Sequence, residues 1–264
     1  MTQNRFDHQE WAVSETVGFV IILGIIMSGI GLVTLYGYPA LLERQADANI
    51  KNMEKTLIVL QTDVNTLAYK NVPYQETTIQ VSGGTLSVAP HHSEPYFNIT
   101  VGANHTQFFP GKLRFISEDG GTIVLLENGG VIKRYPGITG SVMIAEPRWY
   151  YDAPTETLVI TLINITGSNL AQTGIGTISM QLDPDNPPRA QRIPVEGNEV
   201  YIKYKNDIAS DDFYRAWKLF FDKPDLNLEF DPLKSNPEFD FTYKNDTPLK
   251  WVVLKTVNIT VLSL

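Results

Sequence analysis

The sequence predicts an α+β protein. A long N-terminal helix, first hydrophobic and then amphipathic, would precede a mainly antiparallel, β-sandwich-like domain with one short helix near residues 211–222. Three observations predict this fold. Residues 16–42 contain no Asp, Glu, Lys or Arg, and apolar residues then recur three and four positions apart up to Leu67. From about Thr77, short β-branched and aromatic runs alternate with turns rich in Gly and Asn.

Composition narrows the classes of function. The chain of 264 residues carries a formal net charge of -8, which argues against nucleic acid as a partner because the phosphate backbone would be repelled. It contains no cysteine, so disulfides, thiolate catalysis and cysteine-containing zinc sites are excluded. Residues 73–264, which follow the helix, are numerous enough to bury a sizeable core.

The charge-free segment predicts a membrane span. As an α-helix, residues 16–42 would be about 40 Å long, which exceeds the roughly 30 Å of hydrocarbon in a bilayer. A removable secretory signal begins with basic residues and has an apolar stretch of only about 7–15 residues. Here Arg5 is outnumbered by Asp7, Glu10 and Glu15, and the apolar run is longer. We therefore expect a retained membrane helix.

Small residues are spread along this segment. Gly24 and Ser28 form a small-xxx-small pair, while Gly18, Gly24 and Gly31 follow one another about seven positions apart. Such residues let a second helix approach closely. Glycine is also simply tolerated in membrane helices, so both explanations stay open. Under the first, the helix packs against other copies of the chain or against similar subunits.

An amphipathic helix follows the hydrophobic one. Its apolar positions form a continuous seam: Ile50, Met53, Leu57, Leu60, Val64 and Leu67. Pro39 is able either to kink the junction between the two parts or to begin the second. The seam requires a partner, which is either the β domain of the same chain or the same helix in neighbouring copies.

The outer part has the pattern of strands and turns. TTIQVSGGTLSV indicates two strands around Gly83 and Gly84, and TIVLLENGGVIKRY indicates a hairpin that turns at Asn128, Gly129 and Gly130. Further expected strands are KLRFIS, SVMIAE, TLVITLINI, GTISMQL, EVYIKYK and WVVLKTVNITVL. Short strands separated by turns are typical of an antiparallel sandwich or a curved sheet.

One short helix is expected at residues 211–222. Ser210 can cap it, and Asp211 and Asp212 suit its positive N-terminal end. Its apolar face is predicted to belong to the core and consists of Phe213, Trp217, Phe220 and Phe221. The segment after it, DKPDLNLEFDPLKSNPEFD, is rich in Pro and Asp and is predicted to be a long surface excursion.

The sequence gives no positive case for an enzyme. GIGTIS lacks the third glycine of a dinucleotide loop, and DPDNPP favours a solvated turn over a calcium loop because the later Gly and Glu are missing. The adjacent His91 and His92 would point to opposite faces of a strand and could not easily share a metal ion, even with Glu94 nearby. We therefore expect no catalytic residue, no cofactor and no metal site.

Glycosylation sequons favour an exported domain. They occur at Asn98, Asn104, Asn164, Asn245 and Asn258, all C-terminal to the apolar segment. A literal positive-inside count favours the opposite orientation, since three basic residues follow the segment and only Arg5 precedes it. Acidic neighbours offset those three, so we expect a single pass through the cell membrane with an extracellular C-terminal domain.

Residues 12–33, AVSETVGFVIILGIIMSGIGLV, resemble the N-terminus of archaeal type IV pilins and archaellins. In that family a small residue precedes a cleavage point, and a short polar stretch leads into an apolar helix. The wider pattern includes GYPALLERQADANIKNMEKTLIVLQTDVNTLA, ETTIQVSGGTLSV and FYRAWKLFF. It resembles an uncharacterised group of archaeal pilin-like surface proteins.

The resemblance implies processing and assembly. A dedicated peptidase would cut between Ala12 and Val13, leaving Glu15 at the third mature position, although Trp11 stands where the family usually has a charged residue. The domains would then be a leader (1–12), a transmembrane and amphipathic helix (13–70) and an extracellular β-rich domain (73–264). We expect a structural or minor subunit of a pilus-like filament; the alternative is a permanently anchored adhesin or receptor that does not polymerise.

Overall fold

A computed structural model describes the backbone of residues 7–70, 72–89, 95–135, 140–168, 170–195, 200–205, 213–235 and 240–264, and the side chains of these residues from Thr16 onward. The chain divides into two compact units, Met1–Asn49 and Ile50–Leu264. The predicted α+β fold is confirmed: one long N-terminal helical segment precedes a mainly antiparallel β domain that contains a short helix.

The N-terminal helical segment has three parts. Helix α1 (Asp7–Leu32) is followed by one π-helical turn, η1 (Val33–Gly37), and by helix α2 (Tyr38–Lys70). The N–H of Tyr38 donates to the carbonyl of Val33 and closes the π turn. The backbone stays helical from α1 through η1 into α2, so Pro39 lies inside a continuous helical run and removes one helical N–H there. The π turn directly before it is a local irregularity of the kind that accompanies prolines in long helices.

The described residues form a ten-stranded and a five-stranded sheet. The strands of the large sheet are β1 (Tyr74–Ala89), β4 (Lys112–Ser117), β5 (Ile123–Glu127), β6 (Gly130–Arg134), β7 (Ser141–Ala145), β8 (Tyr150–Asp152), β9 (Thr157–Thr166), β10 (Ala171–Leu182), β11 (Arg189–Pro194) and β15 (Trp251–Ser263). Their order is β7-β6-β5-β4-β1-β10-β15-β9-β8, with β11 paired to β15. Among the strand pairs that the structure describes, only β9 and β15 run parallel.

The smaller sheet consists of β2 (Tyr96–Val101), β3 (Asn104–Phe108), β12 (Val200–Lys205), β13 (Leu228–Phe230) and β14 (Asp240–Asn245). Its order is β13-β14-β12-β2-β3. Helix α3 (Tyr214–Phe221) and the 3₁₀ turns η2 (Ala153–Thr155) and η3 (Pro224–Leu226) complete the elements.

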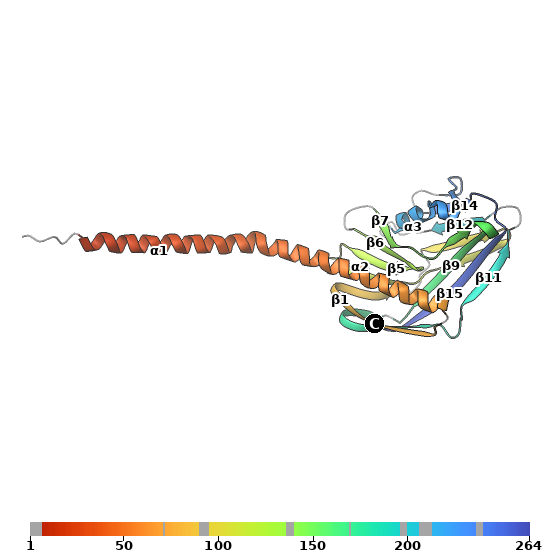
Figure 1. Cartoon of the computed structure of the whole chain (residues 1–264), viewed down its shortest axis with the longest axis horizontal. Helices are drawn as coiled ribbons and strands as arrows, with labels where there is room; N and C mark the ends of the chain where they lie inside the picture. Colours follow the sequence, from red (N-terminus) through yellow and green to blue (C-terminus); the bar gives the residue numbers. More distant parts are fainter. Residues whose placement is uncertain are drawn as a thin grey trace, which may run out of the picture. The chain divides into compact units, whose positions relative to one another are not determined.

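Strand β9 of the large sheet is buried on both faces. Its Leu158, Ile160 and Leu162 belong to one hydrophobic core, and its Ile163 and Ile165 belong to a second. The first core lies between the two sheets and includes the apolar face of α3. The second lies between the large sheet and the C-terminal half of α2. Figure 1 shows α2 and α3 on opposite sides of the large sheet.

The segment TTIQVSGGTLSV forms one bent strand, β1, instead of the two strands expected. Its register shifts between Val81 and Leu86, so the first part pairs with β10 and the second part with β4. Gly83 has a φ of 67°, and a Cβ on Gly84 would lie 2.2 Å from the carbonyl oxygen of Ile116. The glycines therefore allow a β-bulge, which bends the strand without ending it.

The β5–β6 hairpin turns at Asn128 and Gly129, as expected, with φ values of 48° and 77°. The short helix is also confirmed as α3, and Trp217 on its apolar face is fully buried. Its expected capping residues, Ser210, Asp211 and Asp212, lie outside the described residues.

The predicted surface excursion after α3 is wrong in its first part. This segment forms η3 and β13, and Leu226 and Leu228 are 2% and 9% exposed. These two leucines are anchored in the core between the sheets, which the surrounding Pro and Asp residues concealed in the sequence.

Candidate functional site: the apolar helix and its attachment to the β domain

The apolar helical segment presents its side chains to the outside. Every large hydrophobic side chain from Val17 to Leu42 is between 46% and 72% exposed. Within the described residues, this is the one helix long and apolar enough to cross a membrane. Burial of a Leu, Ile or Phe side chain is worth about 1.5–3 kcal/mol, so leaving this run in water would cost on the order of tens of kcal/mol. The segment is therefore suited to membrane anchoring.

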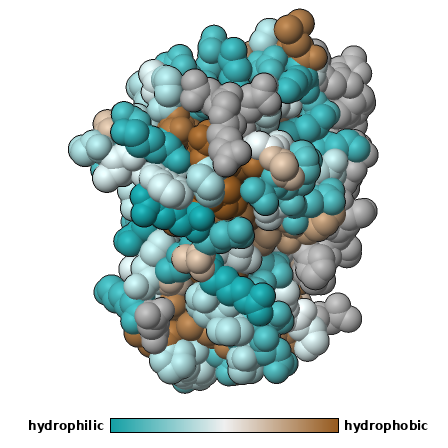
Figure 2. Space-filling model, turned by 90° about the vertical axis from the view of Figure 1, so that its right-hand side faces the viewer, coloured by the Kyte–Doolittle hydropathy of each residue, from teal (hydrophilic) through white to brown (hydrophobic). Residues whose placement is uncertain are grey.

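The face of the β domain that Figure 2 shows differs from the apolar helix. It is mostly hydrophilic, and hydrophobic side chains show in only a few places. That distribution is typical of a domain surface in contact with water.

The small residues of the apolar helix have no packing role in the described chain. A Cβ added to Gly18, Gly24 or Gly31 would meet no described atom within 4 Å, and Ser28 is exposed. Their positions are thus open to a second helix from outside the chain. Ala12, Val13 and Glu15 lie on the backbone of α1, and their side chains are outside the described set, as is that of Trp11.

The amphipathic seam is built into the β domain. Met53, Leu57, Leu60, Val64 and Leu67 are completely buried in the second core, and Ile50 at the start of the seam is half-buried. Their neighbours there include inward-facing residues of β1, β5, β9 and β15. Of the two partners that the sequence left open, the chain's own β domain is the one that covers the seam.

A buried glutamine adds a polar connection between α2 and the large sheet. The side-chain amide of Gln61 donates to the carbonyl of Gly129 at 2.7 Å and to the carbonyl of Glu146 at 2.9 Å. Gln61 is only 7% exposed, so these bonds supply donors to carbonyls where water has little access. The seam pattern did not reveal this contact because Gln61 is polar and lies beside an apolar position.

Two acidic residues strengthen the same attachment. Asp63 is 8% exposed and accepts a hydrogen bond from the hydroxyl of Thr77 at 2.7 Å and one from the amide of Gln75 at 3.3 Å. Glu54 forms an ion pair with Lys133 on β6 at 2.5 Å. Burial lowers the pKa of Lys133, but its interactions with Glu54 and with Tyr135 together more than offset this and raise the pKa overall.

A hydrogen bond from the large sheet also fixes the C-terminal end of α2. The ammonium of Lys255 on β15 donates to the carbonyl of Ala68 at 2.7 Å, which satisfies one of the last helical carbonyls and suits the negative end of the helix dipole. Burial lowers the pKa of Lys255. Polar contacts therefore fix α2 to the large sheet from Glu54 to Ala68.

The sequon asparagines differ in accessibility. Asn104 at the start of β3 is exposed, and Asn98 on β2 is half-buried. Asn164 and Asn258 are half-buried neighbours on the parallel strands, where the side-chain nitrogen of Asn164 donates to the side-chain oxygen of Asn258 at 3.4 Å. Asn104 is therefore the most open of these sites.

Asn245 has a structural role. It is 8% exposed, its side-chain oxygen accepts the N–H of Val200 at 3.1 Å, and its side-chain nitrogen donates to the carbonyl of Thr247 at 3.0 Å. A glycan on that nitrogen would require these contacts to open.

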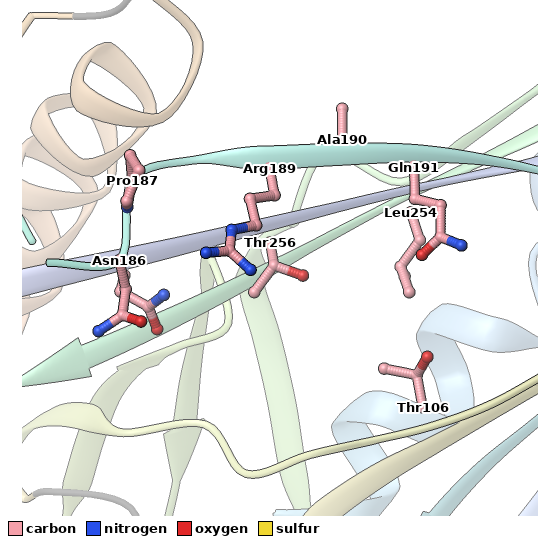
Figure 3. A pocket seen from close by; sticks show the side chains of 9 residues that line it. Thr106, Asn186, Pro187, Arg189, Ala190, Gln191, Leu254 and Thr256 are labelled. Carbon is pink, nitrogen blue, oxygen red and sulfur yellow. The ribbon is translucent and has the colours of Figure 1, made fainter.

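A polar cleft of about 620 Å³ lies beside β11. Figure 3 shows the guanidinium of Arg189 and the side-chain amides of Asn186 and Gln191 in this cleft, with Thr106 of β3 across from them. Asn258 also contributes to its lining. Hydrogen-bonding groups of this kind suit a polar ligand.

In the part of the chain that the structure describes, no three His, Asp or Glu side chains lie close enough together to hold a metal ion. In DPDNPP, hydrogen bonds from the side chain of Asn186 and the N–H of Asp185 lower the pKa of Asp183 and close a turn. His91, His92 and Glu94 lie outside the described residues.

Comparison with known proteins gives a family without an established activity. Residues 12–217 match the model of a family of unknown function, DUF7289. An uncharacterized protein of Archaeoglobus fulgidus is 22% identical in an alignment that covers 80% of this chain and 83% of that protein. No solved structure matches the chain. Because the family model spans well over half of the sequence, the protein belongs to this family of unknown function, DUF7289.

Proposed function

We propose that the protein is a pilin-like, single-pass cell-surface protein that serves as a structural or minor subunit of a type IV pilus-like filament. The observation that carries this proposal is the run of exposed apolar side chains from Val17 to Leu42. A helix of this kind is stable in a membrane, and equally among other such helices in a filament core. The function is assembly and display, without catalysis.

Two further observations support assembly. Residues 12–33 resemble archaeal type IV pilins, and the A. fulgidus relative is also archaeal. The space beside Gly24 is open and Ser28 is exposed, so a neighbouring helix can pack against them. The seam on α2 is already covered, so the helix–helix contacts would involve the segment before it.

The outward orientation of the β domain is part of the proposal. Its support is the set of sequons C-terminal to the apolar segment, of which Asn104 is the most exposed. Glycans on this asparagine in protein from native cells, and their loss in Asn104→Gln, would support it. Protease digestion of the β domain only after cell lysis would contradict it.

Processing is tested on the native protein. Mass spectrometry of its N-terminus is expected to find a mature chain that starts at Val13. An intact N-terminus that retains residues 1–12 would contradict pilin-type processing and would favour the anchored alternative.

Filament incorporation is tested by substitution in the apolar helix. Gly24→Leu places a bulky side chain at a small-residue position and is expected to remove the subunit from purified filaments while membrane insertion is retained. Ile25→Leu is the matched control, because it changes a neighbouring, exposed apolar residue without filling a small site. Equal incorporation of the two variants would contradict helix packing through this face.

The alternative function is a permanently anchored adhesin or receptor that does not polymerise. The polar cleft beside β11 favours it, because such a cleft can hold a ligand. Absence of the wild-type subunit from all surface filaments, together with an uncleaved N-terminus, would select this alternative.

A further inference from the structure

A second pocket lies on the α2 side of the large sheet, next to the C-terminal end of that helix. Its volume is about 550 Å³, and Tyr69 of α2, Thr161 of β9 and Lys255 of β15 line it together with Arg148. Val159 and Val253 contribute apolar side chains to the same surface. The polar cleft beside β11 is a different site, because Thr256 and Asn258, which line it, alternate with Lys255 along β15 and so point to the opposite face.

Two neighbouring buried hydroxyls in this pocket have no partner in good hydrogen-bonding geometry. Thr161 is only 2% exposed, and its hydroxyl lies beside the buried hydroxyl of Tyr69, where it partly offsets the rise that burial causes in the pKa of Tyr69. Within the described residues, neither hydroxyl is satisfied by a well-aligned donor or acceptor. Buried polar groups in proteins are almost always satisfied, so two neighbouring exceptions indicate a place where another molecule supplies the partner. Each hydroxyl could donate to the same acceptor.

The pocket is also cationic. Lys255 and Arg148 lie over the ring of Tyr69, with their charged groups 4.8 Å and 5.0 Å from its centre. Neither forms an ion pair with a carboxylate of the described residues, and no Asp or Glu lines the pocket. In a chain with a net charge of -8, this local excess of positive charge favours an anionic ligand.

We propose that this pocket binds a small organic anion, namely a carboxylate attached to an apolar body. The carboxylate would lie between Arg148 and Lys255 and accept hydrogen bonds from the hydroxyls of Tyr69 and Thr161. The apolar body would rest on Val159 and Val253. This assignment is independent of filament assembly, because all the residues that line the pocket belong to the compact unit Ile50–Leu264 and none to the apolar segment before it.

The test uses the full chain in nanodiscs of zwitterionic lipid, with calorimetric titration of 4-phenylbutyrate and of its neutral analogue 4-phenylbutyramide. Titration of the same compounds into empty nanodiscs measures how much of each the lipid itself takes up. Saturable binding of the acid is expected, with the amide at least about tenfold weaker, because a hydrogen bond to a charged group is strong enough to produce that ratio. Equal affinities for the acid and the amide, or uptake no greater than that of empty nanodiscs, would overturn the proposal.

Substitution of single basic residues tests whether the acid binds in this pocket. Arg148→Met should weaken binding of the acid about tenfold and leave folding intact, because this arginine is exposed and makes no ion pair with a described carboxylate. Lys244→Met on β14 is the matched control and should bind like the wild type, because its ion pair with Glu229 lies on the smaller sheet. Unchanged affinity in Arg148→Met, or an equal loss in the control, would assign the binding elsewhere.

Thr161→Val separates a ligand site from a purely structural position. The variant removes a buried hydroxyl that makes no well-aligned hydrogen bond in the free protein, so it should raise the thermal midpoint of the unliganded chain. It also removes a donor to the carboxylate, so it should weaken binding of 4-phenylbutyrate severalfold. A variant that binds the acid as tightly as the wild type would show that Thr161 does not contact the ligand and would contradict the proposed geometry.

Discussion

Replacement of Leu60 by alanine tests whether α2 is part of the β domain. Leu60 is fully buried in the middle of the seam, between the helix and the large sheet. Leu→Ala at buried sites costs about 2–5 kcal/mol, and the cost rises when the surroundings cannot collapse into the cavity. Hydrogen bonds of the neighbouring Gln61 hold the helix to the sheet, so we expect a loss of about 3 kcal/mol. This corresponds to a decrease of roughly 6–12 °C in Tm.

The assay is denaturant unfolding of the purified full chain in mild detergent, followed by tryptophan fluorescence. Trp149 and Trp217 are buried in the β domain and report its unfolding. Leu219→Ala is the matched control, because it is the same substitution in helix α3 at a side chain that is 61% exposed. The control should lie within about 0.5 kcal/mol of the wild type. A loss in Leu60→Ala no larger than in Leu219→Ala would refute the packing of the seam.

Three further predictions concern buried polar groups. Gln61→Leu should destabilise the chain by about 1–3 kcal/mol for each buried carbonyl that loses its donor, as measured by the same unfolding assay; no loss would contradict the buried contact. Lys112→Met should cost about 3–5 kcal/mol, because it leaves the fully buried Glu127 without the ammonium 3.3 Å away, and adding Glu127→Gln should recover part of this loss. Burial and the hydrogen bond to Asp222 raise the pKa of Tyr243 in the folded protein. As the pH rises, the phenol of the unfolded chain therefore ionises first, near pH 10, and the stability present below that pH is lost above it. The decrease in unfolding free energy from pH 8 to pH 11 should therefore be smaller in Tyr243→Phe, and an equal decrease would contradict this assignment.

The helices could be predicted because their signals are local. The seam from Ile50 to Leu67 and the apolar face of α3 repeat with the helical period, and residues that share a face of a helix are close in sequence. The same patterns did not identify the partner of the seam, because the sheet that covers it is assembled from strands far away along the chain.

The sheet was harder to predict. Gly83 and Gly84 are compatible with a hairpin turn and with a β-bulge, and only the approach of Ile116 to Gly84 decides between them. The parallel pairing of β9 and β15 joins strands more than eighty residues apart and has no local signature. Leu226 and Leu228 are two apolar residues among polar ones, too few to show a period.

The pocket residues also lacked a sequence signal. Tyr69, Arg148, Thr161 and Lys255 come from a helix, a connection and two strands, and their spacing matches no motif. Only the folded arrangement reveals that the hydroxyls of Tyr69 and Thr161 are buried without a well-aligned partner and that no Asp or Glu lines the pocket. The sequons were readable from the sequence, but the structural role of Asn245 was not.

Membrane anchoring by the apolar segment is tested most directly by comparing the membrane partition of the full chain with that of a chain limited to residues 50–264. We expect the full chain to stay in the membrane fraction after alkaline carbonate extraction, because residues 16–42 anchor it. We expect residues 50–264 to be found in the soluble fraction and to unfold cooperatively, because they retain the seam that completes the second core. Extraction of the full chain by carbonate, or retention of residues 50–264 in the membrane, would contradict anchoring by this segment.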